Sequence, residues 1–192
     1  MIFNIPNSLT LLRIGLIPIF VLFFYFPWEW SYLATTITFL LAGITDWLDG
    51  FLARRWGQTS AFGAFLDPVA DKLMVACALI LLVDKNPTDM PDVLLTIPAT
   101  IIVCREIVIS ALREWMAGIG HQTQVAVSVI GKIKTTAQIV AIILLLYKLP
   151  VGSLPTADIG FVLLYVAAGL TLWSMFIYLK AAWPKLNSEG AK

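Results

Sequence analysis

Long apolar stretches recur along the whole chain and leave few choices of fold. A helix needs about 20 mostly apolar residues to cross the roughly 30 Å hydrocarbon core of a bilayer. Six such stretches are separated by short connections, and 59% of the 192 residues are hydrophobic. We therefore expect an all-α, polytopic integral membrane protein that forms a single domain over residues 1–192. Its six transmembrane helices would span about residues 8–26, 31–55, 60–83, 93–117, 125–149 and 156–181.

The charged residues support this class and indicate an orientation. Only 13% of the chain is charged, against roughly 25% in soluble domains, and the net charge of +1 gives no support for nucleic-acid binding. Basic residues gather toward one side of the predicted spans, and this bias places that side and both termini in the cytoplasm. Lys85 and Lys148 lie on the other side, and the basic side holds Arg13, Arg54, Arg55, Lys72, Arg105, Arg113, Lys132, Lys134, Lys180, Lys185 and Lys192.

Four aspartates interrupt the second and third apolar stretches. Asp46 and Asp49 lie in the second stretch, and Asp67 and Asp71 lie in the third. An ionised aspartate at the centre of a membrane helix costs about 2.5–3.5 kcal/mol. Exposed helix ends would explain one or two of these carboxylates. They explain four poorly, because the spacing places the carboxylates on common helix faces.

The spacing brings the acids together in pairs. Asp49, Gly50 and Ala53 follow Asp46 by three, four and seven residues, so these residues share one narrow stripe of a helix. The small residues allow a ligand to approach the backbone closely. On the next helix Asp67 and Asp71 are four residues apart and share a face, and the RWGQTS connection is short enough to lay the two faces together.

Carboxylates held this close repel one another unless cations bind between them. An all-oxygen ligand set favours hard divalent ions such as Mg²⁺ or Mn²⁺ over Zn²⁺. One divalent ion would leave two negative charges uncompensated, whereas two ions would neutralise all four aspartates. We predict a two-metal centre of the kind that clamps phosphoryl groups during displacement. Its ligands would be Asp46, Asp49, Asp67 and Asp71.

Pro68 allows two interpretations of the third helix. Asp67 could cap a helix that begins at Pro68, which would leave too few residues before Asp84 to span a membrane. A helix that begins at Thr59 or Ser60 is long enough and makes Pro68 an internal kink, which would free a backbone carbonyl near the carboxylates. We favour the second interpretation.

The acidic region as a whole resembles a known signature. It has the pattern D-x2-D-G-x2-A-R-x8-G-x3-D-x3-D, which resembles that of the CDP-alcohol phosphatidyltransferases. The whole chain is similar to bacterial members of that family that make phosphatidylglycerol phosphate, through NIPNSLTLLRIGLIPIF, GFLARRW, REIVISALREWMA and GKIKTTAQ. The pattern is filled by Asp46, Asp49, Gly50, Ala53, Arg54, Gly63, Asp67 and Asp71.

The resemblance implies a fold and a reaction. The fold would be the six-helix CDP-alcohol phosphatidyltransferase fold, usually a homodimer, with a polar cavity open to the cytoplasm. The substrates would be CDP-diacylglycerol and sn-glycerol 3-phosphate, and the products phosphatidylglycerol phosphate and CMP. The protein would then be an enzyme of phospholipid biosynthesis in the bacterial cytoplasmic (inner) membrane, with its active site and both termini facing the cytoplasm.

The resemblance also implies roles for individual residues. Asp46 and Asp67 would bridge both metal ions, Asp49 would complete one site, and Asp71 would complete the other and act as general base toward the acceptor hydroxyl. The CDP-diacylglycerol would be held by Asn7, Thr10, Asp49, Gly50, Ala53, Arg54 and Gly63. Two alternatives stand beside this assignment. Asn7 could simply cap the first helix after Pro6, and Arg13 could extend to lipid headgroups.

The acceptor's phosphate requires a cationic pocket. Arg105 is the best candidate, because it lies near mid-span with no room to reach a headgroup, and guanidinium groups grip phosphate bidentately. A competing interpretation pairs the two arginines of this helix with Glu106 and Glu114 as structural ion pairs. The full set of glycerol-3-phosphate candidates is Thr59, Arg105, Arg113, Lys132 and Lys134.

Two other functions fit parts of the pattern. Another acceptor, such as inositol phosphate, would use the same chemistry, and the basic residues do not distinguish the two phosphates. A divalent-cation transporter would explain the intramembrane acids. It leaves Gly50, Ala53 and Arg54 unexplained, since an arginine beside a cation path would oppose permeation.

Overall fold

The computed structural model describes residues 5–56, 61–118 and 129–189, all of them within or between six α-helices. The all-α class and the six helices predicted from the sequence are therefore confirmed. The helices are α1 (Ile5–Tyr25), α2 (Ser31–Trp56), α3 (Ala61–Asp84), α4 (Asp92–Gly118), α5 (Val129–Tyr147) and α6 (Thr156–Glu189).

Two helix starts decide alternatives left open by the sequence. Helix α3 begins at Ala61, so Pro68 lies inside the helix, as we favoured. Helix α1 begins at Ile5, which places Asn7 inside the first turn. The alternative that Asn7 caps this helix is therefore wrong. Pro6 is tolerated so close to the helix start because the first N–H groups of a helix have no intrahelical partner.

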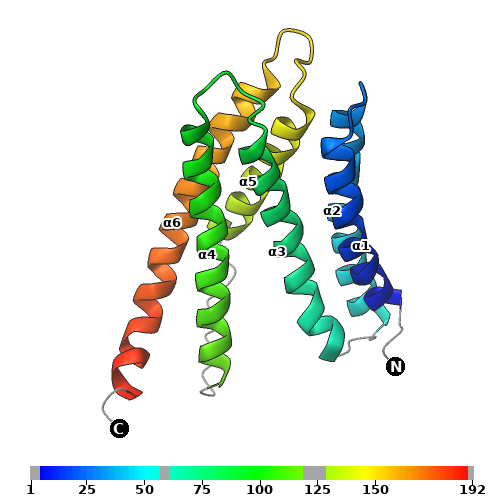
Figure 1. The fold of residues 1–192 in the computed structure, drawn as a ribbon. Coiled ribbons are helices and arrows are strands. Elements are labelled where there is room, and N and C mark those ends of the chain that lie inside the picture. The colour runs from blue at the N-terminus through cyan, green and yellow to red at the C-terminus, as the bar shows by residue number, and fades with distance from the viewer. Residues whose placement is uncertain (1–4, 57–60, 119–128, 190–192) are drawn as a thin grey trace.

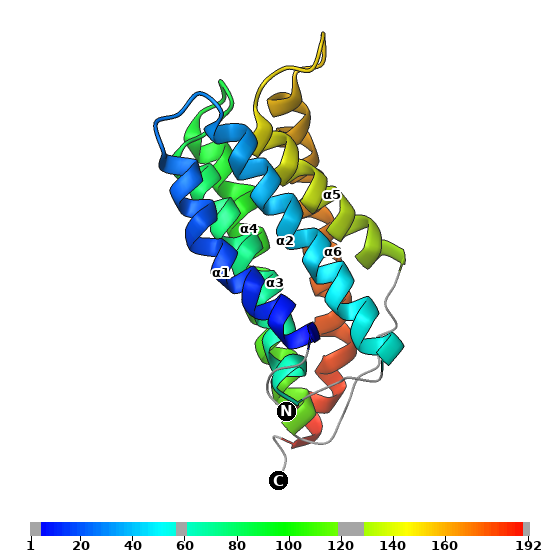
Figure 2. The same ribbon diagram turned by 90° about the vertical axis from the view of Figure 1, so that its right-hand side faces the viewer.

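The helices form a bundle in which chain neighbours are not always spatial neighbours (Figures 1 and 2). Helix α1 packs along α2 and also contacts α3, while α6 packs against both α5 and α4. Short connections led us to expect sequential helices side by side. That expectation fails for α4 and α5, which make no close backbone contact within their described residues.

The two ends of the bundle differ (Figure 1). One end carries the connections α1–α2, α3–α4 and α5–α6. At the other end α1 begins and α6 ends. We call these the connection end and the terminal end.

Buried side chains divide along this axis. The apolar core lies mainly toward the connection end and includes Phe20, Phe39, Leu79, Leu82, Leu95, Ile102, Ile142, Leu145 and Leu164. The buried charged residues lie nearer the terminal end on the same helices, at Arg13, Asp49, Arg105 and Lys134. Each helix therefore contributes an apolar segment to the core, and most contribute polar groups beyond it.

The outer surface is unusually apolar. Side chains such as Leu22, Trp47, Ile80, Ile107 and Phe176 are each more than 60% exposed, although arginine and lysine are buried inside. Three helices are long and apolar enough to cross a membrane over their described residues, at Asn7–Tyr25, Asp92–Met116 and Thr156–Lys180. Exposed apolar faces of this extent favour a lipid environment.

Close packing between α5 and α6 yields a test of the bundle. A methyl group added at Gly160 would lie 3.0 Å from the Ala141 carbonyl oxygen and from side-chain atoms of Leu144 and Leu145. Because overpacking costs about 1–3 kcal/mol, Gly160→Ala should lower the Tm in detergent despite the higher helix propensity of alanine. Gly169→Ala, on the same helix with no atom within 4 Å of the added group, is the control. Equal Tm values for the two variants would contradict this packing.

Candidate active site

A buried arginine joins two of the predicted acids. The Arg13 side chain of α1 is 1% exposed, and its Nη1 lies 2.6 Å from Oδ1 of Asp46 on α2. Its Nη2 donates a hydrogen bond to Oδ2 of Asp49, which is also buried. The alternative that Arg13 extends to headgroups is therefore wrong. The guanidinium instead lies between two carboxylates three residues apart on the next helix.

The first helix presents further polar groups to the same place. Asn7 and Thr10 are buried, and they precede Arg13 by six and three residues on one face of α1. Thr10 Oγ1 lies 3.4 Å from Oδ2 of Asp49 as a weak donor. Gly50 is half-buried beside Asp49. Thr10 and Arg13 of α1 and the acids of α2 are thus brought together.

Asp71 of α3 lies beside this cluster on the wall of a cavity. Arg13 and Asp46 line the same cavity, whose volume is about 290 Å³. The rest of the lining is apolar and includes Phe39, Leu40, Ile44, Met74, Ile139 and Ile143. Charged and apolar side chains therefore line the same cavity. Asp46 of α2 and Asp71 of α3 both contribute to it, as the spacing of the acids led us to expect.

A second charged cluster joins α4, α5 and α6. Glu106 Oε1 accepts hydrogen bonds from Arg105 Nη1 at 2.7 Å and from Lys134 Nζ at 2.9 Å. Arg105 Nη2 also donates to Ser174 Oγ of α6 at 3.2 Å. Arg105 and Lys134 are both buried, so two of the predicted phosphate-binding cations meet on one carboxylate oxygen. The ion pair of the competing interpretation is thus present at Arg105.

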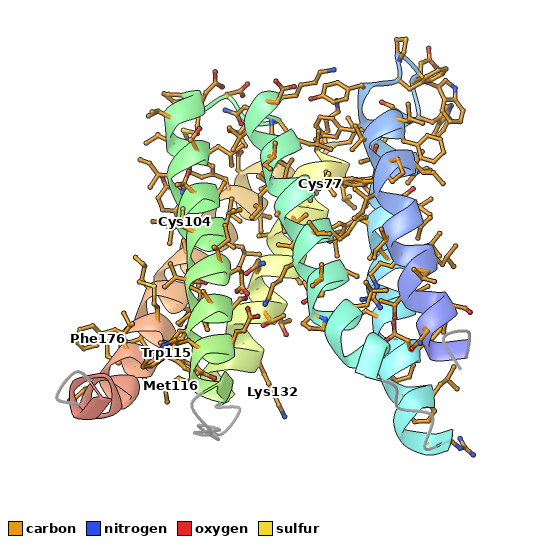
Figure 3. The ribbon with its side chains drawn as sticks, turned by 60° about the horizontal axis from the view of Figure 1, so that its bottom comes forward. Cys77, Cys104, Trp115, Met116, Lys132 and Phe176 are labelled. Atoms are coloured by element: carbon orange, nitrogen blue, oxygen red, sulfur yellow. The ribbon has the colours of Figure 1, made fainter. Side chains whose placement is uncertain are left out.

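The side chains of Lys132 and Lys134 on α5 point in different directions. Lys132 is exposed, and Figure 3 shows its side chain extending past the end of α5, away from the helices. Lys134 turns inward to Glu106. The two lysines therefore do not form one pocket.

Helix α3 links the two clusters. Asp71 lines the same cavity as Asp46 and Arg13 of the acidic cluster. The next residue, Lys72, donates to Ser110 Oγ, and that hydroxyl donates to the backbone oxygen of Glu106. Consecutive residues of α3 thus reach the acidic cluster and the turn of α4 that carries the basic one.

Several predicted site residues cannot be placed by this geometry. Thr59 lies outside the described residues. The backbone of the others is described within a helix, but their side chains are not. These residues are Ala53, Arg54, Asp67 and Arg113. Gly63 is buried in α3.

The acidic cluster is suited to hard cations. Asp46 and Asp49 converge on a single guanidinium, so their oxygens are close enough to share a positive charge. All the donors are carboxylate oxygens, which Mg²⁺ and Mn²⁺ prefer. Among the side chains that the structure describes, which exclude Asp67, no three potential ligands lie close enough together to hold a metal ion.

Sequence reasoning missed two features of the site. It gave Arg13 no carboxylate partner and Glu106 no role toward Lys134. A signal for the first was present, because Thr10 and Arg13 share a face of α1, and a buried guanidinium there requires an acidic partner. The bridge from Glu106 to Lys134 had no local signal, because the two residues lie 28 positions apart.

Comparisons with known proteins identify the family of the chain. The model of the CDP-alcohol phosphatidyltransferase family matches residues 3–173. A CDP-diacylglycerol–glycerol-3-phosphate 3-phosphatidyltransferase of Yersinia enterocolitica is 55% identical over 183 residues, which is 95% of this chain and 97% of the relative. Proteins of the same name from Sodalis glossinidius and Pseudomonas fluorescens are 56% and 52% identical, over 93% and 98% of this chain and 94% and 95% of their own.

The matched region includes all six helices in whole or in part, and it contains both charged clusters. The chain belongs to the CDP-alcohol phosphatidyltransferase family.

The Arg13 pairing predicts a measurable stability effect. Arg13→Gln would leave the buried Asp49 carboxylate without its cation, and breaking such a pair costs about 3–5 kcal/mol. The variant should therefore unfold at a lower temperature than the parent protein in detergent with EDTA present. Arg55→Gln is the control, because Arg55 is exposed and lies over the Phe51 ring. An unchanged Tm for Arg13→Gln would show that the pair does not contribute to folding.

Proposed function

We propose that the protein transfers the phosphatidyl group of CDP-diacylglycerol to sn-glycerol 3-phosphate, giving phosphatidylglycerol phosphate and CMP. The relatives named for this reaction are 52–56% identical to nearly the whole chain. The observation in the structure that carries the proposal is the cavity in which Arg13, Asp46 and Asp71 adjoin an apolar wall. A lipid joined to a nucleotide through a diphosphate needs both surfaces in one place.

The proposed reaction places the protein in the bacterial cytoplasmic (inner) membrane. All six helices would cross it, with the terminal end and the active site in the cytoplasm. Support comes from the exposed apolar faces and from the basic residues concentrated toward one side. A homodimer remains a prediction.

Four carboxylates would hold two divalent cations, Mg²⁺ or Mn²⁺. These are Asp46, Asp49, Asp67 and Asp71, and the convergence of Asp46 and Asp49 on Arg13 supports the first two. When bound, the cations would neutralise charge on the transferring phosphoryl group.

The nucleotide half of the donor would lie along α1 and α2. Thr10 of α1 contacts Asp49, Asn7 is buried on the same helix, and Gly50 removes side-chain bulk from α2 beside Asp49. Ala53, Arg54 and Gly63 complete the proposed set. The acyl chains would leave along the apolar wall of the cavity.

The acceptor would bind between the two clusters. Its free hydroxyl oxygen attacks the lipid-side phosphorus, the bond to CMP breaks, and Asp71 accepts the hydroxyl proton. Aspartate has a reference pKa of about 3.9 and is a weak base at neutral pH, so positioning must supply much of the effect. The place of Asp71 on the wall of the cavity that Arg13 and Asp46 also line supports this assignment.

The acceptor's phosphate would be received by Arg105 and Lys134, with Thr59, Arg113 and Lys132 as further candidates. Arg105 and Lys134 converge from two helices and are nearly fully buried, so their attraction for an anion is weakly screened. Guanidinium and ammonium groups together suit a phosphate dianion.

An acceptor panel tests the function. Purified protein with CDP-diacylglycerol and Mg²⁺ should release CMP and form phosphatidylglycerol phosphate when sn-glycerol 3-phosphate is supplied. EDTA should abolish this product. Inositol phosphate and serine should give little lipid product. A preference for inositol phosphate, or no CMP release with any alcohol, would contradict the proposal.

Asp71→Asn in the same assay tests the base. The neutral amide cannot accept the proton, and general-base catalysis contributes about 10²–10⁴-fold, so turnover should fall by about that factor. Some binding of CDP-diacylglycerol should remain. Turnover near that of the parent protein would reject the assignment.

A further inference from the structure

Glu106 occupies an unusual position between two buried cations. A single oxygen, Oε1, accepts hydrogen bonds from Arg105 Nη1 at 2.7 Å and from Lys134 Nζ at 2.9 Å. The side chains of Arg105 and Lys134 are 9% and 7% exposed, whereas that of Glu106 is 24% exposed. The cations are therefore shielded from water, and the carboxylate between them retains access to it.

This contact fixes the relation of two helices that do not pack on each other. Helices α4 and α5 make no close backbone contact over their described residues, so side chains must set the separation of Arg105 and Lys134. Two buried cations would also repel one another without an anion between them. Glu106 supplies that anion and brings both cations to one point.

The turn of α4 that carries Glu106 is also linked to α3. Ser110 Oγ donates to the backbone oxygen of Glu106, and Lys72 of α3 donates to Ser110 Oγ. Ser174 of α6 holds the other end of the Arg105 guanidinium at 3.2 Å. The arrangement therefore draws on four helices, and Glu106 carries its central negative charge.

We propose that Glu106 is the positioning residue of the acceptor's phosphate subsite. It holds the Arg105 guanidinium and the Lys134 ammonium at a fixed spacing, so that both present donors to one phosphate group. One negative and two positive charges leave a net charge of +1, which still attracts a phosphate dianion. This inference rests on the proposed function, because it requires a phosphorylated acceptor.

Kinetics of Glu106→Gln test the inference. The amide preserves size but loses the charge that gathers the cations, and a hydrogen bond to a charged group is worth enough to change affinity by about tenfold or more. The KM for sn-glycerol 3-phosphate should rise by about tenfold, while the KM for CDP-diacylglycerol changes less than about twofold. Glu106→Asp keeps the charge on a shorter stem and should restore part of the lost affinity.

Glu114→Gln is the matched control. It makes the same chemical change on the same helix at an exposed residue, and both KM values should stay at those of the parent protein. If Glu106→Gln does not fold, the kinetics of Glu106→Asp test the inference instead. In that variant the KM for sn-glycerol 3-phosphate should still exceed the parent value, while the KM for CDP-diacylglycerol should not.

Three results would overturn the inference. A lower KM for sn-glycerol 3-phosphate in Glu106→Gln would show that the carboxylate competes with the acceptor. Equal changes in both KM values, or an unchanged KM for sn-glycerol 3-phosphate in a folded variant, would assign Glu106 to folding alone or to no role. Failure of the parent protein to use sn-glycerol 3-phosphate would instead refute the proposed function, and the parent assay separates the two failures.

Discussion

Buried charge must be compensated inside an apolar bundle, and the rest of this structure depends on how that is done. Two clusters of charged side chains each pair acids with bases, and the net charges of the two clusters have opposite signs. Arg13 lies between Asp46 and Asp49 and leaves a net charge of −1, whereas Glu106 lies between Arg105 and Lys134 and leaves +1. Isolated charges at such positions would cost several kcal/mol each. The pairing keeps the helices together and still leaves each cluster with a net charge that attracts a ligand.

The division of the bundle places both clusters on the same side of the apolar core, toward the terminal end. Apolar core residues such as Phe39 and Leu82 fill the half near the connection end, and close packing there fixes the helix positions. The buried charged residues lie beyond that core, toward the terminal end of the bundle. A rigid apolar half thus supports a polar half whose side chains must be held in register for phosphoryl transfer.

Sequence periodicity predicted the helices and the acidic face of α2 well. Helices α2, α3 and α4 begin and end within one residue of the predicted spans, because runs of apolar residues that end at polar connections fix helix bounds closely. The i, i+3 spacing of Asp46 and Asp49 correctly placed them on one face. Helix α6 extends to Glu189, beyond the predicted Ala181, since a helix can continue past the apolar span.

Periodicity did not predict which faces meet. It fixes the direction of a side chain relative to its own helix, while the partner depends on how helices far apart in sequence rotate and pack. Periodicity therefore allowed the alternative that Arg13 extends to headgroups, although its guanidinium pairs with Asp49 of α2. Periodicity also could not predict that α4 and α5 do not pack on each other over their described residues. It therefore gave no sign that Glu106 would bridge to Lys134.

The central claim is that carboxylates of α2 and α3 jointly hold cations. The most direct measurement is a Mn²⁺ titration of the purified protein followed by electron paramagnetic resonance, with CDP-diacylglycerol present. The account predicts saturable binding of about two ions per chain, as in two-metal phosphoryl sites, and loss of that binding in Asp49→Asn. Absence of saturable binding in the parent protein, or full binding in Asp49→Asn, would contradict it.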